Sequence, residues 1–154
     1  MPVNPIPDGY HSVTPYLIIR GAAEAIEFYK KGFGATELFR MAAPDGKIGH
    51  AEIQVGDSRI MLADEYPDMG YQGPETIGGS PVSLMIYLED VDTVFNRAVD
   101  AGAIVKEAPQ DKFYGDRIGT VIDPFGHRWH LATHKEDVSM EEMERRAKAA
   151  HGGE

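Results

Sequence analysis

The chain has 154 residues, about the size of one domain, and a compact domain of this length buries roughly 70% of its unfolded surface. Its 25 acidic and 15 basic residues give a formal net charge of −10. We therefore expect neither nucleic acid nor an anionic membrane as a partner, because both bind basic surfaces. The sequence contains no cysteine, which excludes disulfides, thiolate metal ligands and thiol nucleophiles.

The beginning of the sequence does not resemble a targeting segment. The stretch MPVNPIPDGYH contains three prolines and an aspartate where a signal peptide needs an apolar run. No stretch reaches the roughly 18 consecutive apolar residues of a membrane-spanning helix. We therefore expect a cytoplasmic protein that does not enter a membrane.

The first half of the chain predicts the element order β-α-β-β-β. Residues 13–20 (VTPYLIIR) are rich in β-branched and aromatic side chains, which is typical of a strand. Residues 22–34 place apolar side chains three and four positions apart, and Gly34 ends this amphipathic helix. Three short strands, separated by the turn signals PDG and GDS, are predicted at 36–42, 48–56 and 58–64.

The second half repeats this order after a long connection. Residues 65–81 are rich in glycine, proline and acidic residues, and a loop of this length predicts a linker or a lid, which would carry Tyr66 and Tyr71. The predicted elements that follow are a strand at 82–89, a helix at 91–103 ended by Gly102, and strands at 103–109, 116–123 and 127–134.

Matching residues place the two halves in register. GKIG at 46–49 resembles DRIG at 116–119, and MLAD at 61–64 resembles HLAT at 130–133. The offset of the second match also pairs Thr14 with Ser83. We interpret the repeat as a duplicated half-domain, because solenoid repeats have periods of only about 20 to 50 residues.

The end of the chain predicts a separate helix at 139–150. Ser139 and Glu142 form a capping box, and acidic residues in the first turn and basic residues in the last suit the helix dipole. A narrow apolar stripe of Met140, Met143 and Ala147 should pack on the domain or on a second subunit.

Two segments, together with the tandem β-α-β-β-β order, carry a resemblance to a known family. They are FYKKGFGA at the end of the first helix and FYGDRIGTVIDPFGHRW before the last strand. The chain resembles the glyoxalase, bleomycin-resistance and extradiol-dioxygenase superfamily, also called vicinal oxygen chelate proteins, and most closely its PhnB-like branch. The resemblance covers about residues 12–134.

The resemblance implies an α+β fold within a single domain, residues 1–154. Modules 12–64 and 82–134 would form two curved mixed sheets around a ligand cleft, with the C-terminal helix added. It also implies a homodimer in which the modules pair either within one chain or between chains.

Metal-dependent members of this superfamily take ligands from the first and fourth strands of each module. The resemblance places these four positions at Thr14, Met61, Ser83 and His130. Only His130 is a good ligand, whereas a catalytic site normally needs three strong nitrogen or oxygen ligands. We therefore expect no metal and no other cofactor.

The other histidines near His130 do not change this expectation. Side chains alternate between the faces of a strand, so His127 points away from the side shared by His130 and His134. The remaining arrangement for a divalent metal combines His50 and Glu52, which share a strand face, with His130 across the cleft. This arrangement stays open as an alternative.

Without a metal, the expected site is an aromatic cleft with a few polar groups that binds a small molecule. Trp129 and His130 point to opposite faces of their strand, so at most one of them faces the cleft. His130 is the candidate catalytic residue, as a general base, or else a structural hydrogen-bond partner. Arg117 would form an ion pair with Asp116 or Asp123, or clamp an anionic substrate. The predicted ligand-binding residues are Tyr16, Met61, Ser83, Met85, Tyr114, Arg117, Trp129 and His130.

Three functional hypotheses follow from the sequence. The first is a small-molecule-binding protein of the glyoxalase and bleomycin-resistance type, with a degenerate metal site, that sequesters a drug or metabolite. The second is an enzyme of the same superfamily, a metal-dependent lyase, isomerase or dioxygenase, and the sequence leaves open whether the protein is an enzyme at all. The third is an interaction protein that works through its C-terminal helix.

Overall fold

The first module forms a four-stranded mixed sheet with one helix, as predicted. Its elements are β1 (Tyr16–Ile19), α1 (Ala22–Phe33), β2 (Thr36–Ala42), β3 (Ile48–Val55) and β4 (Ser58–Asp64). The computed structural model describes residues 2–151. Strand β1 runs parallel to β4, the other pairs are antiparallel, and the strand order is β1-β4-β3-β2. Gly34 ends α1 with φ of 72°, a left-handed conformation that glycine adopts without strain.

The second module repeats this topology. Its elements are β5 (Ser83–Tyr87), α3 (Val91–Asp100), β6 (Ile104–Asp111), β7 (Asp116–Ile122) and β8 (Arg128–His134). The strand order is β5-β8-β7-β6, again with one parallel pair between the first and last strands. The α+β fold of tandem modules predicted from the sequence is therefore confirmed.

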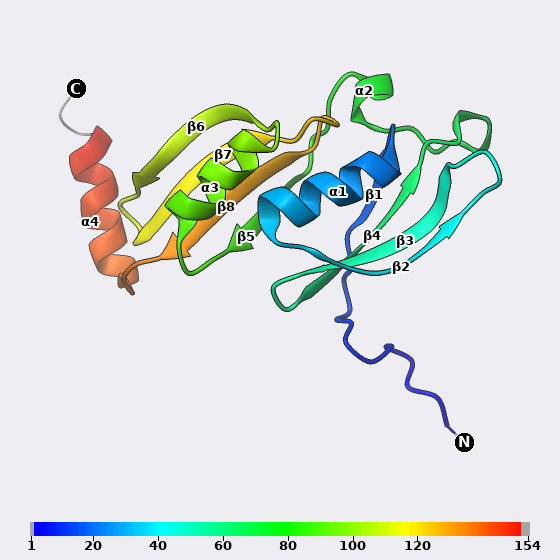
Figure 1. Ribbon diagram of the computed structural model, residues 1–154. Helices are drawn as coiled ribbons and strands as arrows, with labels where there is room; N and C mark the ends of the chain where they lie inside the picture. Colours follow the sequence, from blue (N-terminus) through cyan, green and yellow to red (C-terminus); the bar gives the residue numbers. More distant parts are fainter. Residues whose placement is uncertain (1, 152–154) are drawn as a thin grey trace.

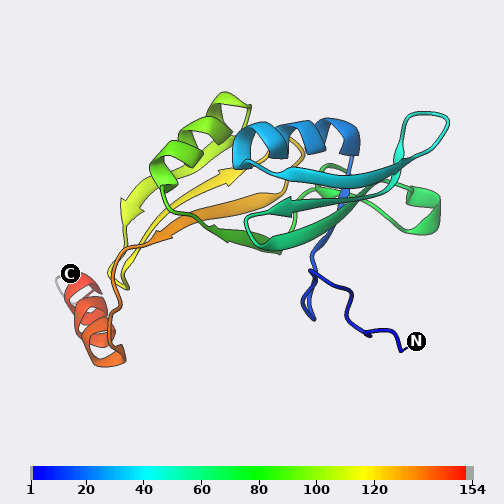
Figure 2. The ribbon, with the colours of Figure 1, turned by 60° about the horizontal axis from the view of Figure 1, so that its bottom comes forward.

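Both helices lie on the same side of the two sheets and pack against each other (Figures 1 and 2). Gly32 allows the two helices to approach closely, because a Cβ atom there would lie 3.3 Å from the Cα of Ala98 in the facing helix. The apolar side chains beneath the helices form one core that runs through both modules. The modules therefore form one packed unit.

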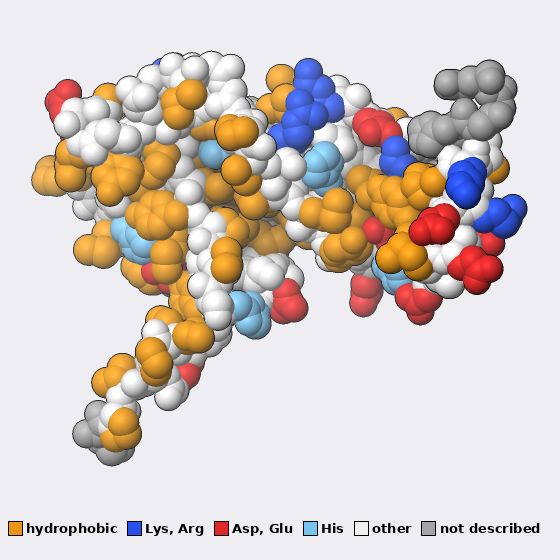
Figure 3. Space-filling model, turned by 180° about the vertical axis from the view of Figure 1, so that it is seen from behind, with side chains coloured by type: hydrophobic (Ala, Val, Ile, Leu, Met, Phe, Trp, Pro, Cys, Tyr) orange, Lys and Arg blue, Asp and Glu red, His pale blue; other side chains and the backbone are white. Residues whose placement is uncertain are grey.

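The opposite face of each sheet, called the open face below, is not covered by α1 or α3. Strand alternation places Tyr16, Phe39, Met41, His50, Glu52 and Met61 on the open face of the first sheet, and Ser83, Met85, Tyr87, Thr120 and His130 on that of the second. Several of these apolar side chains are well exposed, up to 63% for Met41. Figure 3 shows hydrophobic side chains gathered over both halves of this side of the molecule.

A buried carboxylate joins the two modules. Asp123, in the turn between β7 and β8, is 1% exposed. Its Oδ2 accepts hydrogen bonds from the Tyr29 hydroxyl of α1 at 2.6 Å and from the Trp129 indole Nε1 at 2.8 Å. Its Oδ1 accepts from the backbone N–H groups of Phe125 at 2.9 Å and His127 at 3.0 Å. Four donors thus compensate the cost of burying this charge.

Each module fixes the start of its helix with an oxygen from its own fourth strand. In the first module, Asp64 Oδ1 accepts from the backbone N–H groups of Gly21 and Ala22 at 2.9 and 3.0 Å. Asp64 Oδ2 also accepts from Ile48 N–H at 2.7 Å. In the second module, Thr133 Oγ1 accepts from Val91 N–H at 2.9 Å. These bonds satisfy donors that a helix start leaves free.

The linker between the modules contains short helices that the sequence did not predict. They are the 3-10 helix η1 (Pro67–Met69) and the four-residue helix α2 (Pro74–Ile77). Tyr66 and Tyr71 form an isolated β-bridge with N···O distances of 2.9 and 3.1 Å. The linker is therefore an ordered loop that folds back on itself beside the first sheet.

The C-terminal helix α4 (Met140–His151) begins with the predicted cap: Ser139 Oγ accepts from Glu142 N–H at 3.1 Å. The helix lies at the far end of the second module (Figure 1). It is tied there by Arg146, which donates to the Phe113 carbonyl at 2.9 Å and pairs with Glu136 at 2.6 Å. Within residues 2–151, no helix is long and apolar enough to cross a membrane.

We expect Tyr29→Phe to lower the free energy of unfolding by about 1.5–3 kcal/mol, because it removes one of the four donors to the buried Asp123 carboxylate. Urea denaturation measures this loss. The matched change Tyr71→Phe removes a hydroxyl from a side chain that is 52% exposed. It should change the free energy of unfolding by less than about 0.5 kcal/mol. Equal losses in the two variants would show that the bond to Asp123 adds nothing to stability.

We also expect the segment before α4 to loosen as the pH rises. Hydrogen bonds to Asp116 and Asp137, at 2.6 and 2.7 Å, raise the pKa of His134 above its ordinary value. The ion pairs of His134 therefore contribute fully to stability below its unfolded pKa of about 6.5. This contribution is lost as the pH rises through the raised pKa of His134 in the folded state. Amide hydrogen exchange at 135–138, corrected for intrinsic pH dependence, should show this trend, and His134→Gln should abolish it.

Candidate functional site

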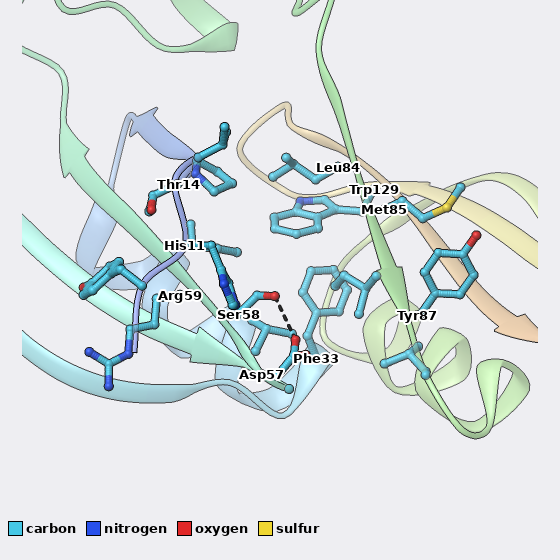
Figure 4. Close-up of a pocket in the computed structure, with 18 residues that line it drawn as sticks. His11, Thr14, Phe33, Asp57, Ser58, Arg59, Leu84, Met85, Tyr87 and Trp129 are labelled. Atoms are coloured by element: carbon cyan, nitrogen blue, oxygen red, sulfur yellow. Dashed lines mark hydrogen bonds between the residues drawn. The ribbon is translucent and has the colours of Figure 1, made fainter. Parts of the chain in front are cut away.

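A groove of about 700 Å³ runs between the two modules along the free edge of β5 (Figure 4). One wall is the segment before β1, including His11 and Thr14, and another is the turn between β3 and β4. Strand β5 and the residue that follows it supply residues 84–88. The groove is the largest of the cavities described here, and its walls come from both modules.

Aromatic side chains form the floor of this groove. Phe33 and Trp129 line it, with ring centroids 4.9 Å apart, and Tyr29 packs beside both. Trp129 is only 1% exposed, and its indole N–H is already bonded to Asp123. The floor is therefore a nearly closed apolar surface, and Trp129 has no free hydrogen-bond donor to offer a ligand.

The predicted catalytic candidate, His130, lies outside this floor on the open face of the second sheet. Its Nδ1 is 2.8 Å from Thr120 Oγ1, and its Nε2 is 3.1 Å from Ser83 Oγ. Both hydroxyls can act as donor or acceptor, so either ring tautomer is satisfied. His130 is thus held between two hydroxyls in a chain that crosses β5, β8 and β7.

The four positions where the resemblance implies metal ligands do not form a strong donor set. Thr14 precedes β1 and lines the inter-module groove, whereas Met61 lies on the open face of the first sheet and Ser83 and His130 on that of the second. In residues 2–151, no three His, Cys, Asp or Glu side chains are grouped so that they could hold a metal ion. The residues present in one chain therefore do not fit a catalytic metal.

Within residues 2–151 of one chain, the alternative trio is not assembled either. His50 and Glu52 lie together on the open face of the first sheet, with 2.7 Å between Nε2 and Oε2. The other ring nitrogen, Nδ1, is 2.8 Å from the hydroxyl of Tyr16. His130 belongs to the second sheet.

Two further predicted ligand-binding residues lie away from the inter-module groove. Arg117 points to the helix side of β7, where its Nε is 3.0 Å from Asp92 and its Nη1 is 3.3 Å from Asp111. These partners replace Asp116 and Asp123, which we expected from the sequence. Tyr114, in the turn before β7, packs edge-on against Phe113 at 5.2 Å. Neither residue lines the inter-module groove.

A second cavity, of about 410 Å³, lies between the open face of the first sheet and the linker. Both linker tyrosines, Tyr66 and Tyr71, line it, as does Tyr16. Burial and the nearby Tyr71 raise the pKa of Tyr16, so its phenol stays protonated at neutral pH. The sequence drew attention to Tyr16 and to the linker, but gave no sign that they share a cavity.

Comparisons with known proteins agree with this architecture. The family described as Glyoxalase/Bleomycin resistance protein/Dioxygenase superfamily matches residues 10–131. The uncharacterized protein Mb0911c of Mycobacterium bovis is 42% identical over 136 residues, which cover 86% of this chain and 90% of that protein.

Solved structures show the same fold. The X-ray structure of the Arabidopsis thaliana gene product At5g48480 is 26% identical with a TM-score of 0.65, covering 80% of this chain and 98% of that one. The PhnB protein of Bacillus cereus has a TM-score of 0.64 at 19% identity, covering 80% and 99%.

Proposed function

Because the chain belongs to the glyoxalase/bleomycin resistance protein/dioxygenase superfamily, we propose that it is a small-molecule-binding protein with a degenerate metal site. One observation carries this proposal. Of the four positions where metal ligands would be expected, only His130 offers a strong donor, and both of its ring nitrogens already have hydroxyl partners. Affinity for a ligand would then come from apolar contact.

The inter-module groove is the site that suits such a ligand best. Its aromatic floor is fixed by packing and by the Asp123 network, so little side-chain ordering is needed when a ligand binds. A volume of about 700 Å³ lies within the usual range for small-molecule sites. Sequestration of an apolar drug or metabolite is the function that this geometry supports.

We further propose that the protein is a homodimer in which a second copy covers the open faces. These faces carry exposed apolar side chains, including Phe39, Met41 and Tyr87, on both sheets. Monomeric proteins rarely leave large contiguous apolar surfaces in water. A two-fold dimer that places the first module of one chain against the second module of its partner would bury both faces at once. The cytoplasmic location expected from the sequence stays a prediction.

We expect aromatic compounds to raise the midpoint of thermal unfolding equally with and without EDTA. Protein dialysed against zinc, nickel and manganese in turn should hold well under one ion per chain by plasma mass spectrometry. Leu84→Glu, which places a charge in the groove, should reduce the shift, whereas Val105→Glu on exposed β6 should not. A stoichiometric ion that is lost in His130→Ala would favour the metal-dependent enzyme instead.

We expect Met41→Glu to convert the dimer into a monomer, because it places a charge on the open face of the first sheet. Sedimentation velocity measures the change. Val105→Glu, an equal change in charge at a strand position outside the open faces, serves as the control and should leave the dimer intact. A wild-type protein that sediments as a monomer would contradict this assembly.

A further inference from the structure

Strand β5 has a sheet edge that no other strand covers. Leu88 N–H, just after β5, donates to the Ala132 carbonyl of β8 at 2.7 Å. Backbone groups alternate along a strand, so the N–H and C=O groups of Met85 and Tyr87 point away from β8 and toward the inter-module groove. Within residues 2–151, no strand lies on that side of β5. Such an edge is a template for an additional strand.

The other three sheet edges are protected in ways that β5 is not. Strands β2 and β6 pair irregularly with their neighbours, and β6 also contains Lys106 and Pro109, which hinder the addition of a strand. At β1, the Ile18 carbonyl accepts from His127 Nε2 at 3.2 Å, and the linker packs against this carbonyl at Gly73. Strand β5, with the sequence SLMIY, has no charge, no proline and a regular pairing with β8. It is therefore the edge best suited to accept a strand.

The N-terminal arm, residues 2–6, exposes apolar side chains to solvent. Val3 is 87% exposed and Ile6 is 46% exposed. The arm leaves the body on the side of the open faces and stands clear of both sheets (Figures 1 and 2). Its sequence, PVNPI, carries no charged side chain and has the same length as β5. The arm therefore matches the β5 edge in length and in polarity.

Contacts at the root of the arm direct it away from its own groove. Tyr10 N–H donates to the Pro7 carbonyl at 3.0 Å and closes a turn. The guanidinium of Arg59 lies 4.9 Å from the Tyr10 ring centroid, and its Nη1 donates to the Asp8 carbonyl at 3.3 Å. A Cβ atom at Gly9 would lie 2.5 Å from this guanidinium, so the turn requires glycine there. Because Tyr10 lines the inter-module groove, the arm starts at this groove but points out of it.

The proline inside the arm allows it to pair along one edge only. In an extended arm, the N–H and C=O groups of Asn4 and Ile6 point to one edge, and those of Val3 and Pro5 point to the other. Pro5 has no N–H, so the second edge cannot continue a ladder of hydrogen bonds. An arm that adds to a sheet in this way also ends the sheet, and it leaves no new edge open to further chains.

We propose that the N-terminal arm of each chain adds to the free edge of β5 in a second copy and closes the inter-module groove of that copy. This inference rests on the homodimer proposed above. When the first module of one chain faces the second module of its partner, the two inter-module grooves face each other across the two-fold axis. The arm starts beside its own groove and extends toward the side of the open faces, so it meets the groove of the partner. Each groove is then completed by the other chain.

Amide hydrogen exchange at Met85 and Tyr87, measured by NMR, tests the pairing. We expect these amides to exchange about tenfold more slowly in the full chain than in a variant that lacks residues 2–6, because hydrogen-bonded edge amides are protected. Two single changes in the arm form a matched pair. Asn4→Pro removes an N–H from the pairing edge and should abolish the protection, whereas Val3→Pro removes an N–H from the other edge and should preserve it.

Cross-linking identifies the chain that supplies the arm, because the protein has no cysteine of its own. Ile6→Cys and Met85→Cys are placed on separate chains, which are refolded together and treated with a short bismaleimide. A link between positions 6 and 85 then joins two chains, and we expect to find it by mass spectrometry. Val105→Cys on the outer strand β6, used in place of Met85→Cys, should give no link.

The outcomes separate this inference from the dimer on which it rests. Equal exchange with and without the arm, or protection by the arm without a link between chains, would overturn the inference while a dimer in sedimentation velocity leaves the assembly standing. A wild-type protein that sediments as a monomer would overturn both.

Discussion

The burial of Asp123 is the constraint on which the two-module arrangement depends. A carboxylate at 1% exposure is tolerated only when its lone pairs are occupied, and Asp123 fills them with two backbone N–H groups, an indole and a phenol. The phenol belongs to Tyr29, 94 residues earlier in the chain. Helix α1 must therefore sit against the β7–β8 turn, and this position brings α1 beside α3 and creates the groove at the edge of β5.

Much of the fold could be predicted because its elements have clear periodicity. The spacing of apolar residues predicted α1 and α3, and the repeated strand pattern predicted both sheets, including the opposite orientations of Trp129 and His130. The segment DPFGHRW supported the family resemblance, and the structure gives it a physical role. It supplies Asp123, three of the donors to its carboxylate, and Gly126 at φ of 100° in the turn. The helices of the linker were missed because they are too short to show a period.

The site was harder to predict, since it depends on contacts between elements far apart in the sequence. Strand alternation could place His50 and Glu52 on one face, but a neighbour for His50 from β1 follows only from the order β1-β4-β3. The partner of Arg117, Asp92, comes from the first turn of α3, whose position above the sheet no local pattern reveals. The groove wall before β1 was also missed, because a proline-rich stretch without periodicity gives no information about what it contacts.

The two helix starts are held in the same way by two different side chains. Asp64 and Thr133 occupy matching places in the repeat, at the end of the fourth strand, and each presents an oxygen to the first N–H groups of the helix in its own module. A carboxylate and a hydroxyl look unrelated in an alignment of the halves, yet they perform the same task. At this position an acceptor is therefore sufficient, whether or not it carries a charge. The carboxylate does more than the hydroxyl, since the second oxygen of Asp64 accepts from Ile48 N–H and fixes the start of β3 as well.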